Sequence, residues 1–278
     1  MLKISVVTIS YNQAEFLERC IQSVLSQNYP NLEYIIVDPG STDGSRDIIK
    51  KHENVFSHIL LDPDSGPADG LNKGFAKATG DLLYFINSDD IVLPEAFRTA
   101  VRYFEDDAGL DVLLGNGLEI DKQDNVMRKI MIDKFDHKGY VYGANIIFQQ
   151  SFFFTRKAFE AIHGFNANNK VSWDSELLID FALHGCTFKK SGFCFGAIRS
   201  YGTTITEQIR TNEKFRKRYL ENNERMFEKV VKRKRNKSDS YWKYYYFALK
   251  VLNNPHNLLK VFKSKKKAYA EVSSTITR

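Results

Sequence analysis

The sequence predicts an α/β protein whose mostly parallel sheet is flanked by helices. Short apolar or β-branched runs that fit buried strands alternate with segments whose apolar residues recur at helical spacing. Strands that alternate with helices in this way form parallel sheets with right-handed crossovers. The 278 residues, 43% hydrophobic and 27% charged, are enough for one large soluble domain or two smaller ones. The first four strands are expected at 4–9, 34–37, 58–61 and 82–86.

The elements of the N-terminal segment follow from local signals. Strand 4–9 is largely β-branched and apolar, and Asn12 can cap the helix that follows it. The apolar residues of that helix recur at helical spacing until Pro30 ends it. A tight Pro-Gly loop follows strand 34–37, and Ser45 is expected to cap a short second helix. The chain therefore begins with repeated strand–helix units.

The strand at 82–86 ends in a group of polar residues. It is a short apolar run of the kind found in a strand covered on both faces, and a helix from about residue 68 precedes it. Open α/β sheets place their ligands at the carboxyl ends of such strands. Adjacent carboxylates repel each other, and oxygen ligands of this kind suit Mg²⁺ or Mn²⁺. The polar residues that close the strand are Asn87, Ser88, Asp89 and Asp90.

Phosphate-binding loops of the common types are absent from the sequence. It contains no Gly-x-x-x-x-Gly-Lys-Ser/Thr, and no Gly-x-Gly-x-x-Gly opens a helix after a strand. A phosphate-bearing ligand would therefore need a metal ion and side chains.

The second half has an α+β character. Its regular alternation is lost between 117 and 150, where polar, hairpin-like pieces such as 119–128 occur. The other elements expected are helices at 94–105, 156–163 and 173–184 and strands at 112–114 and 151–154.

The C-terminal segment is helical and basic. Residues 213–271 carry 18 Lys and Arg against 6 Asp and Glu, whereas the rest of the chain carries 22 against 28. Basic clusters at 232–237 and 265–267 are interleaved with aromatic and aliphatic runs at 241–247 and 258–263. This composition suits a helix in the interface of an anionic membrane, where each Lys or Arg contributes about 1 kcal/mol. The alternative is a set of helices packed on the preceding domain with solvated basic faces.

The cysteines and the N-terminus indicate the compartment. Cys20, Cys186 and Cys194 have no metal-site spacing, and their odd number argues against a disulfide framework. The N-terminus enters a strand without a cleavable secretory pattern, and no apolar run approaches the roughly 18 residues needed to span a bilayer. We therefore expect a cytoplasmic protein, peripheral on the inner face of the cell membrane.

Four sets of residues form one pattern along the chain. They are 4–12, 34–38 with 40–43, Asn72-x-Gly74 with Ala78-x-Gly80, and 86–90. Together these segments resemble the family 2 glycosyltransferases, which are inverting nucleotide-sugar enzymes with the GT-A fold, and Asn87 would hold the first place of the family's Asp-x-Asp motif. The resemblance covers about residues 3–202.

On the donor side, the resemblance implies a role for each matching residue. Thr8 and Tyr11 would hold the nucleotide base, Tyr11 by stacking, and Asp38 would accept the uracil N3 hydrogen. Asp89 would bind the Mn²⁺ or Mg²⁺ ion that bridges the diphosphate. The other donor contacts implied are Asn12, Asp69, Asn72, Lys73, Asn87, Ser88 and Asp90.

On the acceptor side, the resemblance implies that Asp174 is the catalytic base and Trp173 a platform for a sugar ring. Gln150 and Ser151 would contact the donor sugar or the acceptor. Inverting displacement needs one carboxylate to take the proton of the attacking hydroxyl. It also needs positive charge at the departing diphosphate, which a metal ion supplies.

The chain departs from the family pattern at two positions. Tyr201 stands where many members carry a histidine that is a further metal ligand. The metal would then bind more weakly, or Tyr201 would contact the phosphate instead; the resemblance otherwise groups Tyr201 with the acceptor or sugar contacts. Asp180 stands where an arginine is frequent, six residues after the base, which affects the expected acceptor site.

Structural alternatives remain for several of these residues. The acids after strand 82–86 could cap a loop or helix, and Asp38 could form a turn before Pro-Gly. Asp174 could be an N-terminal helix acid that interacts with the helix dipole, with Glu176 as the competing base. Trp173 and Gln150 could simply pack in the interior.

We therefore expect a metal-dependent, inverting hexosyltransferase that moves a sugar from a UDP-sugar to a saccharide acceptor. The basic tail suggests a polyprenyl-linked acceptor in bacterial cell-surface polysaccharide biosynthesis, such as lipopolysaccharide or capsule. The expected division is a GT-A domain at 1–205, with a nucleotide half at 1–116 and an acceptor half at 117–205, and a basic extension at 206–278.

Two other classes of function remain open. One is a nucleic-acid-binding α/β module whose basic aromatic tail tracks phosphates and stacks bases. The acidic body argues against it, and no nucleic-acid partner is expected. The other is a catalytically inactive sensor that binds a nucleotide sugar without transferring it.

Overall fold

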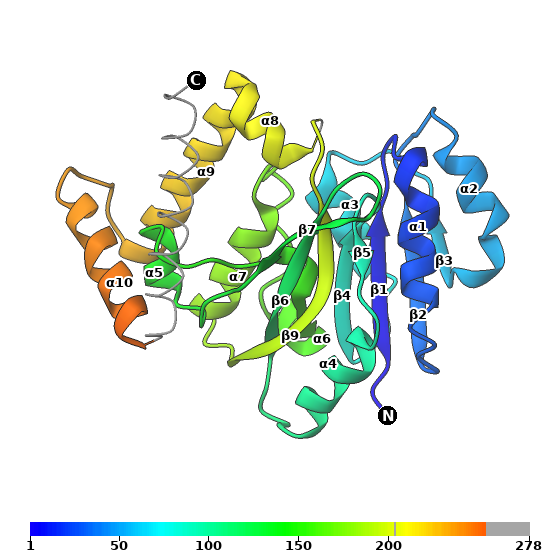
Figure 1. The fold of residues 1–278 in the computed structure, drawn as a ribbon, viewed down its shortest axis with the longest axis horizontal. Helices are drawn as coiled ribbons and strands as arrows, with labels where there is room; N and C mark the ends of the chain where they lie inside the picture. Colours follow the sequence, from blue (N-terminus) through cyan, green and yellow to red (C-terminus); the bar gives the residue numbers. More distant parts are fainter. Residues whose placement is uncertain (203, 254–278) are drawn as a thin grey trace, which may run out of the picture.

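The computed structural model describes residues 1–202 and 204–253. The predicted tail runs at 258–263 and 265–267 lie outside the described residues. Within the described part of the chain, nine strands form one mixed sheet with helices on both faces (Figure 1). The expected fold class is therefore confirmed.

The N-terminal strands form the parallel part of the sheet. Their order is β3-β2-β1-β4, and β1 pairs in parallel with both of its neighbours. The register aligns Ile9, the last residue of β1, with Val37 on one side and Asn87 on the other, so three carboxyl ends lie together. These strands are β1 (Ile4–Ile9), β2 (Leu32–Val37), β3 (His58–Leu60) and β4 (Leu82–Asn87).

The remaining strands extend the sheet in mixed directions. The order continues from β4 through β8, β6 and β9 to β5, and β7 pairs with β6. The pairs β4–β8, β6–β8, β6–β7 and β5–β9 are antiparallel, whereas β6–β9 is parallel. The bounds are β5 (Ile91–Val92), β6 (Val112–Ile120), β7 (Val126–Ile130), β8 (Phe152–Thr155) and β9 (Phe188–Arg199).

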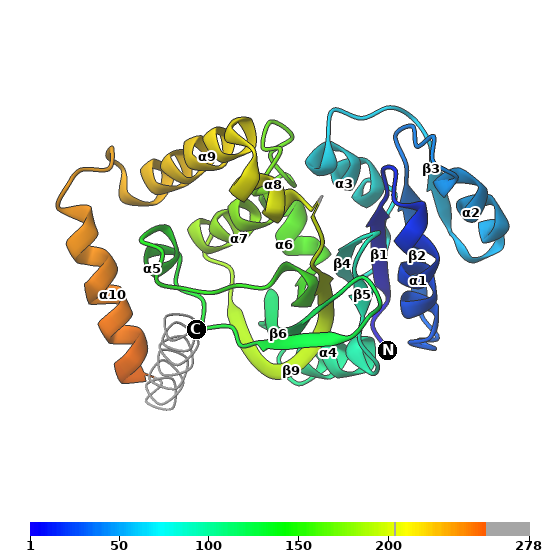
Figure 2. The ribbon, with the colours of Figure 1, turned by 45° about the horizontal axis from the view of Figure 1, so that its top comes forward.

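Two hydrophobic layers hold helices on the two faces of the sheet (Figures 1 and 2). Because successive strand residues point to opposite faces, Val6 of β1 packs in one layer and Val7 in the other. The layer of Val6 holds α1 (Ala14–Leu25), α2 (Ser45–Lys51) and α4 (Ala96–Glu105). The layer of Val7 holds α3 (Pro67–Phe75), α6 (Arg156–Ala161) and α7 (Trp173–Leu183).

Short helices and the C-terminal helices complete the described chain. Two 3₁₀ turns are η1 (Glu53–Val55) and η2 (Gln149–Ser151). The other helices are α5 (His137–Val141), α8 (Ile205–Thr211), α9 (Glu213–Val231) and α10 (Asp239–Asn253). α10 lies at the end of the molecule opposite α2 in both views (Figures 1 and 2). None of the helices in the described residues is long and apolar enough to cross a bilayer.

The C-terminal helices differ in how they pack. α9 buries Met226, Phe227 and Val230 in a third apolar cluster with residues of α5 and α7. α10 contacts the α5 region through Tyr246, which stacks on Tyr142 with the ring centroids 5.3 Å apart. The packed-helix alternative therefore describes α9, whereas most aromatic side chains of α10 are exposed.

Two predicted helix caps are wrong. Asn12 lies outside α1 with a φ of 52°, and its Oδ1 accepts from the Thr42 backbone N–H at 2.9 Å. Its amide therefore fixes a neighbouring loop. Ser45 is the first residue of α2, and the N-cap is Gly44, whose φ of 99° is a conformation that favours glycine.

Candidate functional site

A cavity of about 440 Å³ opens where β1 and β4 end. Its wall includes Asn87, the last residue of β4, then Ser88 and Asp89, and also Asp174 near the start of α7. The two carboxylates are 85 positions apart in the sequence and line the same space. The cavity therefore joins the metal-type acids of the first half to the candidate base of the second half.

Asp89 is held on two sides at the cavity wall. The Tyr201 hydroxyl donates to Asp89 Oδ2 at 2.8 Å, and Arg199 Nε donates to the Asp89 backbone oxygen at 2.8 Å. Burial raises the pKa of the Asp89 carboxyl, although the Tyr201 hydrogen bond acts in the opposite direction. Tyr201 also contacts Gln13, whose Oε1 lies 3.1 Å from the phenol oxygen. Tyr201 thus supports the acid that was predicted to bind the metal.

Asp90 is enclosed by donors from distant parts of the chain. Its Oδ1 accepts from the Arg199 backbone N–H at 2.8 Å, and its Oδ2 accepts from Gln150 Nε2 at 2.7 Å and Asn87 Nδ2 at 3.3 Å. Burial and the charge of Asp89 raise the pKa of Asp90. These hydrogen bonds hold the side chains of Asp90 and Gln150 in fixed positions in the cavity wall.

The oxygen atoms beside Asp89 suit a hard divalent cation. Asn87 Oδ1 is buried without a hydrogen-bond partner and lies in the wall that also contains Asp89. Among the described residues, no group of three or more His, Cys, Asp or Glu side chains could hold a metal. An ion here would take Asp89, the Asn87 oxygen, water and ligand oxygens, which is the usual manner of Mg²⁺. The residues present therefore fit such an ion.

Arg199 at the end of β9 is a site residue that sequence reasoning missed. Its buried guanidinium bonds the Asp121 carbonyl at 2.8 Å, forms an ion pair with Asp124, and stacks 4.9 Å from the centre of the Phe16 ring. Its Nη2 has no hydrogen-bond partner, and the side chain lines the cavity. A buried cation in this place suits an anionic ligand.

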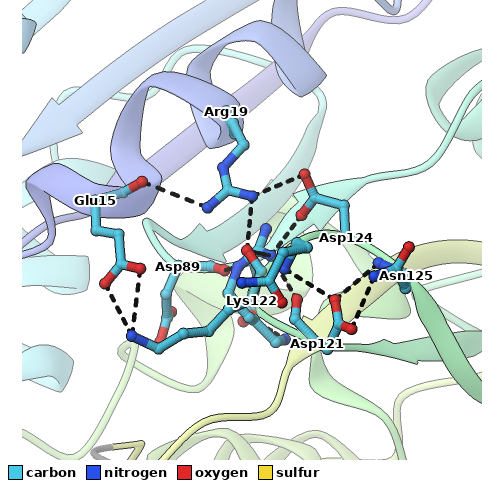
Figure 3. Close-up of polar contacts among 10 residues, drawn as sticks. Glu15, Arg19, Asp89, Asp121, Lys122, Asp124 and Asn125 are labelled. Atoms are coloured by element: carbon cyan, nitrogen blue, oxygen red, sulfur yellow. Dashed lines mark hydrogen bonds and ion pairs between the residues drawn. The ribbon is translucent and has the colours of Figure 1, made fainter.

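The β6–β7 loop lies against the first turns of α1 (Figure 3), and its residues Asp121 and Asp124 contact Arg199. Lys122 pairs with Glu15 at 3.1 Å, and Arg19 pairs with Asp124 at 2.9 Å. Figure 3 shows the loop residues gathered around Asp89 and the first turns of α1. The hairpin that the sequence suggested at 119–128 therefore supports the site as well as the sheet.

A second cavity of about 450 Å³ adjoins the first. Both are lined by Ile9, Tyr11 and Pro67, and the second also contains Pro39 and Asp64. Tyr11 is 61% exposed, so its ring is free to stack on a planar ligand. Burial raises the pKa of Asp64, a residue that sequence reasoning did not select.

Two predicted base-binding side chains do not reach either cavity. Thr8 is fully buried on the side of the sheet that α1 covers, the layer of Val6, where its hydroxyl lies 3.0 Å from the Tyr34 phenol oxygen. Asp38 is also fully buried, and it accepts from the Ser41 N–H at 2.8 Å, the Ser41 hydroxyl at 2.6 Å and Arg46 Nε at 3.1 Å. Burial would raise the Asp38 pKa, but these hydrogen bonds lower it. The turn-forming alternative therefore describes Asp38, and Asn12 fixes the same loop.

The polar residues of α3 are also committed to local contacts. Asn72 bonds both backbone groups of Phe165, at 2.8 and 2.9 Å. Lys73 donates to the Pro63 carbonyl at 2.6 Å and lies 3.6 Å from Asp69. None of the three lines the two cavities. The side chains of Asp69, Asn72 and Lys73 therefore lie outside both cavities, and their contact with a donor stays a prediction.

Ser151 is a structural residue in this arrangement. Its buried hydroxyl donates to the Asn116 carbonyl at 2.6 Å and accepts from the Gly196 N–H at 3.1 Å. It joins β6 and β9 at the end of η2 and does not line the cavity. The neighbouring Gln149 and Gln150 do line it.

The two candidate bases on α7 are clearly different. Glu176 is 3% exposed and is surrounded by Asn166, Asn169 and Arg225, at 3.0, 2.8 and 2.7 Å. Its carboxylate is therefore committed to these contacts, although the Arg225 side chain itself is partly exposed. Asp180 similarly pairs with Lys229 of α9.

Asp174, by contrast, faces the cavity. Burial raises the pKa of its carboxyl, and the nearby Ser175 hydroxyl is 3.4 Å from Oδ1. Trp173 lines the same wall, and its buried Nε1 has no hydrogen-bond partner. The pair thus offers a carboxylate beside an aromatic surface.

Comparison with known proteins identifies the family. The model of Glycosyl transferase family 2 matches residues 5–164. An uncharacterized glycosyltransferase of Nostoc sp. is 38% identical over 130 residues, or 44% of this chain and 40% of that protein. One from Mycobacterium tuberculosis is 30% identical over 65% of this chain and 69% of that protein. The putative teichuronic acid biosynthesis glycosyltransferase TuaG of Bacillus subtilis is 42% identical over 31% of this chain and 36% of that protein. The Nostoc and Bacillus matches thus span less than half of those relatives.

Solved structures share the fold. S. aureus TarS in complex with UDP-GlcNAc has a TM-score of 0.60 and 18% identity, covering 72% of this chain and 59% of that chain. The mannosyltransferase PcManGT from Pyrobaculum calidifontis, in complex with GDP-Man and Mn²⁺, has a TM-score of 0.63 and 18% identity. The match covers 97% of this chain and 75% of that chain. The resemblance drawn from the sequence is confirmed: the chain belongs to glycosyltransferase family 2 and has the GT-A fold.

Proposed function

We propose that the protein is an inverting hexosyltransferase that moves a sugar from a nucleotide donor, a UDP-sugar, to a saccharide acceptor. The observation that carries this proposal is the position of Asp89 and Asp174 in one cavity. The adjoining cavity beside Tyr11 has room for the nucleoside. The donor molecules named for the two structural neighbours, UDP-GlcNAc and GDP-Man, support a nucleotide sugar as the ligand.

The residues have distinct parts in the proposed reaction. Tyr11 stacks on the base, and the Arg199 guanidinium attracts the diphosphate. Asp89 and the Asn87 oxygen would hold Mn²⁺ or Mg²⁺, which when bound supplies positive charge at the departing diphosphate. Trp173 positions the sugar ring. Asp174 takes the proton from the acceptor hydroxyl as the hydroxyl oxygen bonds to the anomeric carbon of the donor sugar. The bond from that carbon to the diphosphate breaks in the same step, which inverts the configuration at the carbon.

We also infer a division into a catalytic domain at 1–205 and a basic extension at 206–278. The acceptor half would begin within β6, since the predicted boundary at 116 falls inside that strand. The relative named for teichuronic acid biosynthesis supports a function in bacterial cell-surface polysaccharide assembly. A polyprenyl-linked acceptor would agree with the basic C-terminal helices.

Thermal shift with a panel of nucleotide sugars tests the proposed function. We expect a UDP-sugar with Mn²⁺ to raise the melting temperature more than GDP- or ADP-sugars, because binding to the folded state stabilises it. The selected donor should then give transfer to a saccharide acceptor. Binding without any transfer or hydrolysis would favour the inactive sensor. Absence of nucleotide-sugar binding, with a salt-dependent shift of an oligonucleotide, would contradict the proposal.

We further propose that α10 contacts an anionic membrane surface. Tyr241 and Tyr244 are 71% and 72% exposed, and Lys243 lies between them in the sequence. Replacement of both tyrosines with serine should reduce co-sedimentation with vesicles containing anionic lipid, because aromatic side chains contribute binding at the interface. The control replaces the exposed Val126 and Met127 of β7 with serine. Equal pelleting of the tyrosine variant and the control would reject membrane contact through α10.

A further inference from the structure

A third cavity, of about 540 Å³, lies between α5 and the C-terminal helices. Ile147 belongs to the walls of both this cavity and the cavity that contains Asp89 and Asp174. Three tyrosines line it, two from α5 and its C-terminal end and one from α9, and none of them was selected from the sequence. They are Tyr140, Tyr142 and Tyr219. Because the two cavities share Ile147, this one lies beside the proposed reaction centre, on the side of the basic C-terminal helices.

A chain of polar contacts joins this cavity to the candidate base. The Tyr140 hydroxyl lies 2.7 Å from Ser175 Oγ, and Ser175 Oγ lies 3.4 Å from Asp174 Oδ1. Burial and the Asp174 charge raise the pKa of Tyr140, so its hydroxyl stays protonated. A molecule that fills the cavity is thus separated from the carboxylate by two side chains that bond each other.

Two cations line the far wall. Arg235 is fixed in place because Nε bonds Glu224 at 2.7 Å, Nη2 bonds the Val141 carbonyl at 3.0 Å, and the guanidinium stacks on Phe227 at 4.1 Å. Lys243 of α10 has no carboxylate within 4 Å of its nitrogen among the described residues. The wall therefore has an ordered cation and a free one.

An unsatisfied polar atom also lies in this wall. Asn145 Oδ1 is buried without a hydrogen-bond partner, and Asn145 lines the cavity. An acceptor oxygen of this type suits a ligand hydroxyl, because a buried polar atom left unpaired costs free energy. Aromatic faces, an amide oxygen and two cations together suit a saccharide that carries a negative charge.

We propose that this cavity binds the acceptor saccharide and that Arg235 and Lys243 bind an anionic group on it, a phosphate or a carboxylate. The inference rests on the proposed function and deepens it by naming the acceptor class. The acceptor enters between α5 and α10, its charged group stays beside Lys243, and its reactive hydroxyl reaches the space beside Asp174 past Ile147. The C-terminal helices then select the acceptor.

Binding of three short probes to the full chain tests the inference without a donor. The probes are butyl-diphosphate-linked N-acetylglucosamine, butyl glucuronide and the neutral butyl N-acetylglucosaminide, each measured by calorimetry. We expect the wild type to bind one charged probe at least about ten-fold more tightly than the neutral one, as expected for a hydrogen bond to a charged group. The diphosphate and the glucuronide distinguish a phosphate from a carboxylate as the recognised group.

Lys243→Gln provides the critical variant and Lys237→Gln its control. Lys243 is exposed, so its replacement keeps the fold, and Lys237 is an exposed cation of the same region that does not line the cavity. We expect Lys243→Gln to weaken the preferred charged probe about ten-fold and to leave the neutral probe unchanged. Lys237→Gln should behave as the wild type.

Three outcomes would overturn the inference: equal affinities of the wild type for charged and neutral probes, equal effects of the two lysine variants, or no binding of any probe. UDP-sugar binding is measured separately on the same samples. If the wild type does not bind a UDP-sugar, the proposed function is rejected. Charge-selective probe binding that depends on Lys243 would still support the cavity as a site for an anionic saccharide.

Discussion

Asp174→Asn is expected to lower the rate of sugar transfer by about a hundred-fold to ten-thousand-fold, the usual contribution of a positioned general base. Asparagine keeps the size of the side chain but cannot take a proton at neutral pH. UDP-sugar binding should be unchanged, because Asp174 lies on the α7 side of the cavity and Tyr11 and Asp89 lie on the β1 and β4 side. Steady-state kinetics and calorimetry on the same preparation separate the two effects.

The matched control for this substitution is Asp47→Asn. Asp47 is also an acid in the first turn of a helix, α2, but it is exposed and lines none of the three cavities. Its replacement should leave transfer unchanged. Turnover retained by Asp174→Asn would show that the base is elsewhere, and loss of donor binding together with transfer would indicate a general disturbance of the site.

The pH profile of the wild type gives an independent check on Asp174. Burial raises the pKa of its carboxyl, and only the ionised form can act as a base. Activity should therefore fall with decreasing pH at a value above the ordinary Asp pKa of about 3.9. The same shift affects stability. The protonated Asp174 carboxyl stabilises the folded protein. This stabilisation is fully present at pH values below the pKa of Asp174 in the unfolded chain, and it is lost as the pH rises through the pKa of Asp174 in the folded protein. Asp174→Asn should accordingly melt at a higher temperature than the wild type at neutral pH.

The sequence allowed prediction of the sheet centre because its signals are local. β1 has the predicted bounds, and β2 and β4 differ by only one or two residues at an end, since a buried parallel strand is a continuous apolar run. β9 was missed because Lys189, Lys190 and Gly192 interrupt any apolar pattern. That strand depends on its pairing with β6, which is far away in the sequence. Its pairing brings Arg199 to the site.

The site residues also divide into those with a local sequence signal and those that depend on distant parts of the chain. Asp89 comes shortly after a strand, and Asp174 lies in the first turn of a helix. Both positions can be recognised from the local sequence pattern. The choice between Asp174 and Glu176 required α9, because Arg225 neutralises Glu176 from 49 residues further on. The side chain of Thr8 lies away from the cavities because side chains alternate between the two faces of a strand, and the sequence alone does not say which face opens onto a ligand.

Asp89→Asn should remove the dependence of donor binding on Mn²⁺. With Mn²⁺ present, we expect the variant to bind a UDP-sugar at least about ten-fold more weakly than the wild type, because neutral asparagine attracts a divalent ion far less than a carboxylate does. With EDTA the order should reverse. The wild type then places the partly buried Asp89 near a diphosphate, and removal of that negative charge relieves a repulsion.

A reversal of this kind separates loss of a metal ligand from general damage, which would weaken binding under both conditions. Calorimetry of four combinations, two proteins with Mn²⁺ or EDTA, measures it, and Asp47→Asn should follow the wild type throughout. Tyr201→Phe gives an intermediate case. Because the Tyr201 hydroxyl donates to Asp89 Oδ2, its removal should weaken Mn²⁺-dependent binding by less than the loss of the carboxylate. Mn²⁺ dependence that persists in Asp89→Asn would place the cation on other residues and would leave Asp89 as a support for the loop around Arg199.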